Sequence, residues 1–333
     1  MASWKIFEGT RRPHDRIRSE LPPPPRWREF KGGPVVDPFP ADLDWDSSQA
    51  AAYRPTTEAV EQVNAALYLR RPLLVTGPPG TGKSTLAAAV AYELGLGPPL
   101  HWPITSRVTL RDGLYEYDPL TRLYDERRRQ VDADDIGRYL RLGPLGTALL
   151  PYDRPRVLLI DEIDKSDLDL PNDLLTIFEK GEFEIPELSR RENPAANVLT
   201  ADSGTDRVLV EDGFVRCRSF PFVVMTSNGE REFPPAFLRR CISLELNQPA
   251  DEAELTAIIR EHLGALSAER ADLVSTLVGE FFARQNAGDL ATDQLLNALY
   301  LCHHAARVEA VNVVELAEKV MPYISGQPGS DGR

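Results

Sequence analysis

Apolar positions along the chain change their spacing in an order that predicts helices alternating with strands. From Thr56 to Arg70 they recur on one face of a helix, which Pro72 ends. Short continuous apolar runs, typical of strands buried on both faces of a sheet, occupy 73–76, 157–160 and 222–226. Because helical stretches and loops separate these runs, we expect an α/β fold with a parallel sheet flanked by helices.

Only helical spacing continues after Pro249. Helices fit the segments at about 251–264, 268–285, 292–307 and 313–325. We therefore predict a small all-α domain after the α/β domain. The predicted division is an N-terminal arm over 1–48, an α/β domain over 49–248, a helical domain over 249–325 and a disordered tail over 326–333.

The N-terminal arm differs from the rest of the chain in its prolines and its charge. It contains the run Pro22–Pro25 and further prolines at 34, 38 and 40. Up to Lys31 it has eight basic residues against four acidic ones. Proline-rich runs favour extended polyproline II over packed structure. Two interpretations stay open, namely a tether that wraps over the main domain and an arm that docks a partner.

The bulk composition limits the compartments and partners to consider. The net charge of −13 weighs against tight, non-specific binding of nucleic acid, which needs clustered Lys and Arg. The cysteines Cys217, Cys241 and Cys302 lack metal-ligand spacing, and so sparse a set suits a reducing compartment. No apolar run reaches the ~18 residues of a membrane span, and the N-terminus has no secretory signal. We expect a cytoplasmic protein without a membrane span.

A phosphate-binding motif follows the first apolar run. The pattern GxxxxGK[ST] is matched by Gly77, Pro78, Pro79, Gly80, Thr81, Gly82, Lys83 and Ser84. It lies between a predicted strand and a predicted helix over 84–94, where glycines can turn successive N–H groups toward a polyanion. We predict that ATP binds here, with Lys83 reaching the β- and γ-phosphates, Ser84 coordinating Mg²⁺ and Thr85 supporting the α-phosphate. A Gly-rich turn without a ligand is the alternative.

Two carboxylates end the second apolar run. Asp161 and Glu162 follow it, and the carboxyl end of a parallel strand opens into the ligand crevice. We expect Asp161 to act on Mg²⁺ through a bound water, and Glu162 to polarise the water that attacks ATP. Asp164 and Lys165 are expected to cap and pair within the following turn. The acidic pair favours ATP hydrolysis over a GTPase switch.

Polar residues also end the third apolar run. Residues 226–230 read TSNGE, and residues 234–241 read PPAFLRRC. Together with the two motifs above, this order resembles the MoxR branch of the AAA+ ATPases over about residues 50 to 325. The resemblance implies that Asn228 is the sensor-1 residue that orients the attacking water. It also implies that Arg240, or its neighbour Arg239, is an arginine finger, whereas pairing with surface acids is the alternative.

The resemblance further implies a ring of identical subunits, a hexamer, that acts on a protein client with a von Willebrand A-type partner. It implies a helical lid, in which Gln294 stands where a sensor-2 arginine is expected. The segments 100–156 and 181–220 exceed minimal crossovers, and in this branch such places hold insertions that line the pore or face substrate. Solvated loops are the alternative. In the second segment, Asp212-Gly213 between two β-prone runs indicates a hairpin.

Three functions remain open. The first is an ATPase that remodels or activates a protein partner. The second is a partner-gated switch in a defence or signalling assembly, which the absent sensor-2 arginine and the Pro-rich arm favour. The third is a nucleic-acid-linked AAA+ motor, which is disfavoured because the arginine runs at 127–129 and 190–191 lack interleaved aromatic residues.

Overall fold

The computed structural model of the protein describes residues 4–128, 135–202, 207–249, 251–264, 270–285, 290, 292–308 and 313–321. These residues belong to two compact units. The first unit comprises Met1–Thr76 and Ser84–Leu244, and the second comprises Gly77–Lys83 and Glu245–Arg333. Arg129, Ala291 and the predicted tail over 326–333 lie outside the described residues.

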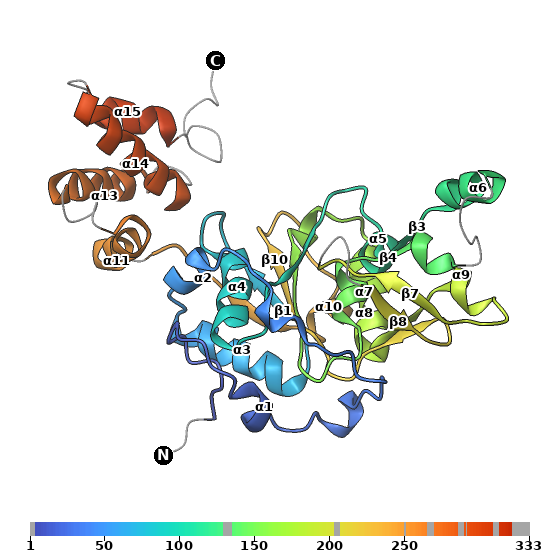
Figure 1. Ribbon diagram of the computed structural model, residues 1–333. Coiled ribbons are helices and arrows are strands. Elements are labelled where there is room, and N and C mark those ends of the chain that lie inside the picture. The colour runs from blue at the N-terminus through green and yellow to red at the C-terminus, as the bar shows by residue number, and fades with distance from the viewer. Residues whose placement is uncertain are drawn as a thin grey trace. The chain divides into compact units, whose positions relative to one another are not determined.

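A sheet of five strands, counted over the described residues, forms the centre of the first unit (Figure 1). The order is β11–β1–β10–β5–β2, with β1 at Leu73–Thr76, β2 at Leu100–Pro103, β5 at Val157–Asp161, β10 at Phe222–Ser227 and β11 at Ile242–Glu245. β10 pairs in parallel with β1 and β5, and β5 pairs in parallel with β2. The predicted parallel sheet is confirmed, and every residue of the central strand β10 is buried.

The sequence pattern does not reveal the outer strands β2 and β11. In β2 the buried Leu100 and Trp102 alternate with exposed neighbours, and β11 alternates in a similar way. An alternating run of this length is a weak signal, whereas continuous apolar runs mark strands that are covered on both faces. Because β1, β10 and β5 are parallel, their carboxyl ends lie along one edge of the sheet.

Helices flank this sheet, and α3 and α8 bury their apolar residues while leaving polar ones exposed. They include α2 at Ser48–Ala52, α3 at Thr57–Leu69, α4 at Lys83–Glu93, α7 at Pro144–Ala148, α8 at Leu170–Lys180 and α10 at Pro235–Leu238. The Thr56 hydroxyl caps α3 by accepting from the Ala59 N–H at 3.1 Å. The helix ends at Arg70, whose left-handed backbone (φ 52) turns the chain toward β1. The helix predicted from Thr56 to Arg70 therefore forms.

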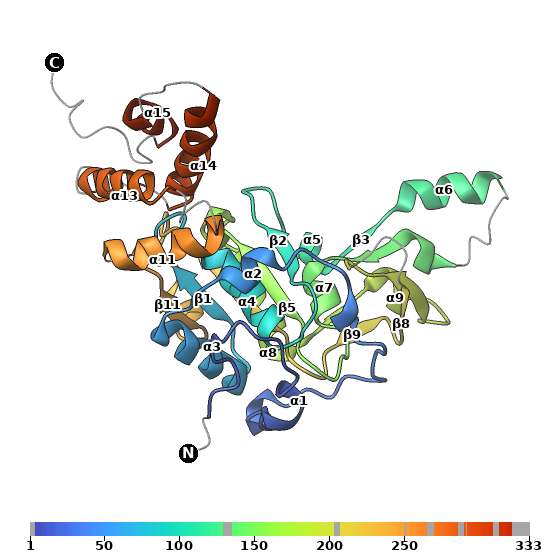
Figure 2. The same ribbon diagram turned by 60° about the vertical axis from the view of Figure 1, so that its left-hand side comes forward.

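The two long connections fold into additional sheets (Figure 2). Within the described ranges, one sheet has the order β3–β4–β7–β8, with β3 at Tyr115–Tyr117, β4 at Leu140–Leu142, β7 at Ala196–Leu199 and β8 at Arg207–Val210. A separate antiparallel pair joins β6 at Glu182–Glu184 to β9 at Phe214–Arg216. The accompanying helices are α5 at Leu110–Leu114, α6 at Pro119–Arg128 and α9 at Pro186–Ser189. Both views show α6 projecting beyond β3. Because the two segments contain paired strands and helices, they are folded elements and not simply solvated loops.

The predicted hairpin around Asp212-Gly213 does not form. Both residues have a positive φ, of 57° and 70°, as a tight turn requires. The strands on either side nevertheless pair elsewhere, since β8 pairs with β7 and β9 pairs with β6. The Phe214 N–H closes the turn by donating to the Glu211 carbonyl at 3.2 Å, but the bonds of Gly213 lead to other segments. The Gly213 N–H donates to the Pro194 carbonyl at 2.9 Å, and the Gly213 carbonyl accepts from the Ile185 N–H at 2.8 Å. The turn therefore forms as predicted, but the strands on either side of it pair with distant strands and not with each other.

The described part of the N-terminal arm is fixed to α3 and α4. It contains α1 at Ile17–Glu20 and two short 3₁₀ turns, η1 at Arg26–Arg28 and η2 at Pro40–Asp42. The Ile6 and Phe7 N–H groups donate to the buried Asn64 Oδ1 at 2.7 and 3.1 Å. The Glu93 carboxylate, also buried, accepts three more N–H groups from the arm. Buried side chains of α3 and α4 therefore satisfy the backbone of a segment that has few bonds of its own.

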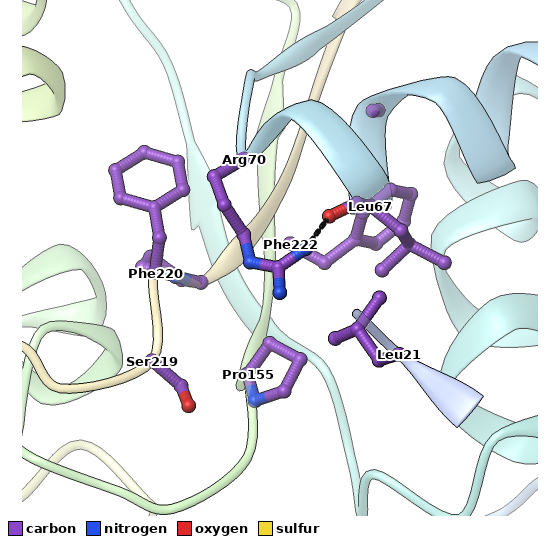
Figure 3. A pocket seen from close by; sticks show the side chains of 9 residues that line it. Leu21, Leu67, Arg70, Pro155, Ser219, Phe220 and Phe222 are labelled. Atoms are coloured by element: carbon purple, nitrogen blue, oxygen red, sulfur yellow. Dashed lines mark hydrogen bonds between the residues drawn. The ribbon is translucent and has the colours of Figure 1, made fainter. Parts of the chain in front are cut away.

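A small cavity lies where the arm meets the end of α3 (Figure 3). Leu21 of the arm, Arg70 and Phe222 are among the side chains that line it. The Arg70 guanidinium donates to the carbonyl of Leu67 and, at 2.6 Å, to that of Pro22. Burial lowers the pKa of Arg70 to about 10. With a volume of about 30 Å³, the cavity has room for a water molecule but not for a nucleotide.

The second unit is helical after residue 245 in its described part. Its helices are α11 at Glu252–Leu263, α13 at Ala271–Gln285, α14 at Thr292–Val308 and α15 at Val313–Val320. The Asp251 side chain caps α11 by accepting from the Glu254 N–H at 2.8 Å. Leu277, Phe281 and Leu299 are fully buried in the core between these helices. The helical pattern after Pro249 is therefore confirmed.

Candidate functional site

Three polar side chains meet at the carboxyl edge of the central sheet. The Ser84 Oγ, in the first turn of α4, donates to Asp161 Oδ1 at 2.7 Å. The Thr226 Oγ1 donates to the same oxygen at 2.6 Å. Thr226 reaches Asp161 because β10 pairs with β5 in the register Met225 to Ile160. The two residues predicted to act on the metal, Ser84 and Asp161, are thus in direct contact.

The surroundings of Asp161 keep its carboxylate ionised. His101 of β2 lies with its Nε2 3.4 Å from Asp161 Oδ2. Hydrogen bonding by His101, and then by Thr226 and Ser84, lowers the pKa of Asp161 to about 2, although burial acts in the opposite direction. An ionised carboxylate beside a hydroxyl offers hard oxygen ligands at neutral pH.

This donor set suits Mg²⁺ that arrives with a nucleotide. Over the described parts of the chain, no group of three or more His, Cys, Asp or Glu side chains could hold a metal ion. Mg²⁺ commonly uses one or two protein ligands and completes its coordination with water and substrate phosphates. Ser84 and Asp161 therefore fit such an ion without a complete protein cage.

Three hydrogen bonds fix the orientation of Glu162. Its backbone is left-handed (φ 59, ψ 50), and its N–H donates to the Thr226 Oγ1 at 2.8 Å. Its carboxylate accepts from the Lys165 Nζ at 2.7 Å and from the Asn228 Nδ2 at 3.4 Å. The Glu162 side chain remains 42% exposed. The predicted base and the predicted sensor-1 residue are therefore neighbours, and Lys165 pairs with Glu162 as expected for this turn.

Asp164 has a different role from the predicted cap. Its Oδ2 accepts the backbone N–H of Asn228 at 2.9 Å and that of Glu230 at 3.2 Å. The side chain is 5% exposed and therefore ties the turn after β5 to the chain that follows β10. Sequence reasoning missed this contact, and those of Thr226 and His101, because each depends on which strands are neighbours. The one available signal was that all three residues lie at or near strand ends.

The phosphate-binding loop connects β1 to α4 and has the conformation that its glycines permit. Gly82 has a φ of +81°, which side chains rarely adopt. At Gly77 a Cβ would lie 2.0 Å from the Leu246 carbonyl oxygen, so no larger residue fits. The Lys83 Nζ donates to the Gly77 and Pro78 carbonyls at 2.7 and 2.8 Å. The ammonium group thus lies over the loop, where the predicted phosphates would bind, and Thr85 lies in the first turn of α4.

The two predicted finger arginines differ in their contacts. The Arg240 guanidinium forms an ion pair with Glu179 and donates to the Ala236 carbonyl at 3.0 Å. Arg239 is exposed, and its carbonyl accepts from Arg71 at 3.1 Å. Within a single chain, Arg240 therefore pairs with a surface acid, which is the alternative to a finger role. Gln294 lies in the first turn of α14, within the second unit.

The fold and the site define a P-loop ATPase. A strand, a Gly-rich loop and a helix are followed by an acidic strand end and by a polar end of the neighbouring strand. A comparison with protein families matches residues 72–241 to the AAA domain of the dynein-related subfamily. The match spans more than half of the chain, and the protein belongs to this AAA family of ATP hydrolases.

Other comparisons find only distant likeness. No curated protein matches the sequence. NtrX from Brucella abortus in complex with ADP is 14% identical with a TM-score of 0.43, covering 81% of this chain and 54% of its own. PCH-2 from C. elegans is 15% identical with a TM-score of 0.39, covering 82% and 65%. The chain thus spans less than two thirds of either structure, and the likeness is too remote to bear on function. No helix in the described ranges has the length and apolarity of a membrane span.

Proposed function

We propose that this protein hydrolyses ATP with Mg²⁺ to remodel or activate a protein partner, as a MoxR-like ring of identical subunits. The observation that carries the proposal is the contact network of Asp161, Ser84, Glu162 and Asn228 at one edge of the sheet. The resemblance to the MoxR branch favours a hexamer and a partner of the von Willebrand A type.

In the proposed mechanism, the loop N–H groups and Lys83 bind the β- and γ-phosphates, and Thr85 supports the α-phosphate. Ser84, and Asp161 through a bound water, would hold Mg²⁺, and this ion would neutralise charge on the phosphate oxygens. Glu162 accepts a proton from the attacking water, and Asn228 orients that water. Arg240 of the next subunit stabilises the charge that develops on the γ-phosphate.

A second candidate, a partner-gated switch, is favoured by two ion pairs. Lys165 occupies one carboxylate oxygen of Glu162, and Glu179 occupies the guanidinium of Arg240. The proposed base and the proposed finger are thus both engaged within the chain. Exposed pairs of this kind contribute little, so a partner or a neighbouring subunit could release them at small cost. In this version turnover is slow until a partner binds.

The test is the mass of the Glu162→Gln protein in solution by light scattering, with ATP–Mg²⁺ and without nucleotide. The substitution removes the base and keeps the phosphate-binding loop, so we expect ATP to bind, to persist and to convert monomers into a ring-sized species. Lys83→Ala is the control, because it should bind no nucleotide and stay monomeric. A Glu162→Gln protein that stays monomeric with ATP bound would contradict the ring. Phosphate release by Glu162→Gln at the wild-type rate would contradict the base assignment.

A further inference from the structure

A cavity at the amino edge of the sheet contains Arg240 and has no assigned role. Its volume is about 340 Å³, and its lining combines apolar side chains with Trp27, Arg28, Arg71, Glu179 and Arg240. Arg71 and Pro72 immediately precede β1, and the Pro72 carbonyl accepts from the Ile242 N–H at the start of β11. The cavity thus lies at the strand beginnings, whereas Asp161 ends β5 at the opposite edge.

The two edges carry opposite charge. Among the described residues that line the cavity, three arginines face one glutamate. At the carboxyl edge Asp161, Glu162 and Asp164 outnumber Lys165 and the loop residue Lys83, and bound ATP would add further negative charge there. Each edge of one copy is therefore complementary to the other edge of a second copy. Contacts between unlike patches of identical chains are head-to-tail, and they close into rings when the rotation permits.

Trp27 stands out on this face because it is exposed and firmly anchored. Its side chain is 78% exposed, in the 3₁₀ turn η1 of the N-terminal arm. The adjacent Arg28 fixes that turn by donating to the Phe178 carbonyl at 2.7 Å and, through Nε, to the Arg70 carbonyl at 3.1 Å. Its guanidinium also lies 4.6 Å from the centre of the Phe220 ring. An anchored, exposed indole is typical of an interaction hot spot.

Arg71 links the cavity to the proposed finger. Its Nη1 donates to the Arg239 carbonyl at 3.1 Å, directly before Arg240. We propose that Trp27 and Arg71 join Arg240 in the surface that receives the next copy of this chain, with Trp27 packing against that copy and Arg71 positioning the finger segment. The Pro-rich arm then forms part of the ring interface. This inference rests on the proposed function, and it extends the interface to a segment outside the AAA match.

The test compares two exposed tryptophans of the arm in the Glu162→Gln background. Trp4, which is 50% exposed and packs edge-on against Tyr68, does not line the cavity and is the matched control. Trp27→Ala should raise the protein concentration for half-maximal ATP-dependent assembly by at least about tenfold. Trp4→Ala should leave it within about twofold, because the residue lies outside the proposed contact. Both variants should keep the ATP affinity of the monomer.

Acrylamide quenching provides a readout that does not depend on a destabilised variant. The Trp27 signal, taken as the difference between the parent and Trp27→Phe, should be accessible without nucleotide and protected after assembly. In the wild-type background, Arg71→Gln should lower kcat about tenfold without weakening ATP binding, and Arg71→Lys should recover part of the loss.

Two outcomes separate this inference from the proposed function. A parent that assembles with ATP, while Trp27→Ala assembles at the same concentration, would overturn the inference and leave the ring in place. The Trp27 face would then serve a different protein. A parent that does not assemble would overturn both. Unchanged quenching of Trp27 on assembly would likewise exclude it from the contact.

Discussion

At the carboxyl edge of the central sheet, Asp161 accepts hydrogen bonds from Ser84 and Thr226, whereas at the amino edge Arg240 forms an ion pair with the exposed Glu179 and a hydrogen bond to the Ala236 carbonyl. At the first edge Asp161, Glu162 and Asp164 each accept hydrogen bonds from groups within the chain. The second edge has excess positive charge and an exposed tryptophan. The difference suggests that one edge is built to hold a ligand and the other to meet another molecule.

The largest effect is expected when the positive charge of Arg240 is removed from the amino edge. Arg240→Ala should lower ATP turnover by about 10³–10⁵-fold, because a finger stabilises the transition state from outside the site it serves. ATP binding should persist, since the phosphate-binding loop is intact. Phosphate release and equilibrium nucleotide binding measure the two effects.

Mixing distinguishes a finger from a local structural role. Lys83→Ala subunits bind no nucleotide but carry an intact Arg240, so adding them to Arg240→Ala subunits should restore part of the activity. The adjacent Arg239→Ala is the matched control and should lose less activity. An absence of rescue would mean that the site is not shared between subunits.

At the carboxyl edge, Asp164→Ala should reduce turnover by about tenfold to a hundredfold. The substitution removes the acceptor for the Asn228 and Glu230 N–H groups, and a small displacement of a water-orienting residue is costly. Steady-state kinetics should show the loss in kcat. Asp167→Ala, an exposed carboxylate in the same turn, should be close to wild type. Equal losses in both variants would argue against a specific role for Asp164.

The unfolding free energy of an Arg28 variant tests how the arm is anchored. Arg28→Ala removes a guanidinium whose pKa is lowered by burial and leaves the Phe178 carbonyl without its donor. We expect a loss of about 1–3 kcal/mol in unfolding free energy, which thermal and denaturant unfolding would measure. Arg26→Ala, an exposed arginine of the same turn, should change stability by less than about 0.5 kcal/mol. An equally stable Arg28→Ala protein would show that the arm is not fixed through this residue.

The smallest expected effect concerns the pair that holds Glu162. Lys165→Met should raise basal turnover by up to about fivefold, because an exposed ion pair contributes less than about 1 kcal/mol. The exposed Lys180→Met on α8 serves as a control for the lost charge. The rate of phosphate release by the isolated protein measures this basal turnover. A fall in turnover would mean that Lys165 assists hydrolysis and does not restrain the base.

The strongest local patterns were sufficient for much of the fold. The continuous apolar runs of β1, β5 and β10 predicted the parallel sheet, because strands covered on both faces need apolar residues throughout. The alternating strands β2 and β11 were missed, since runs of this length occur by chance. The Asp212-Gly213 turn was found but its hairpin was wrong, because strand pairing depends on distant segments.

The sequence by itself determined the phosphate-binding loop, the acidic strand end and the polar end of β10, because their chemistry is carried by residues that are close along the chain. Only the tertiary structure decided which of these groups touch. Thr226 reaches Asp161, Asp164 holds the Asn228 backbone, and Trp27 stands near Arg240 through contacts between segments about 60 to 210 residues apart. Such contacts follow from strand order and packing, which are properties of the whole chain and not of any local window.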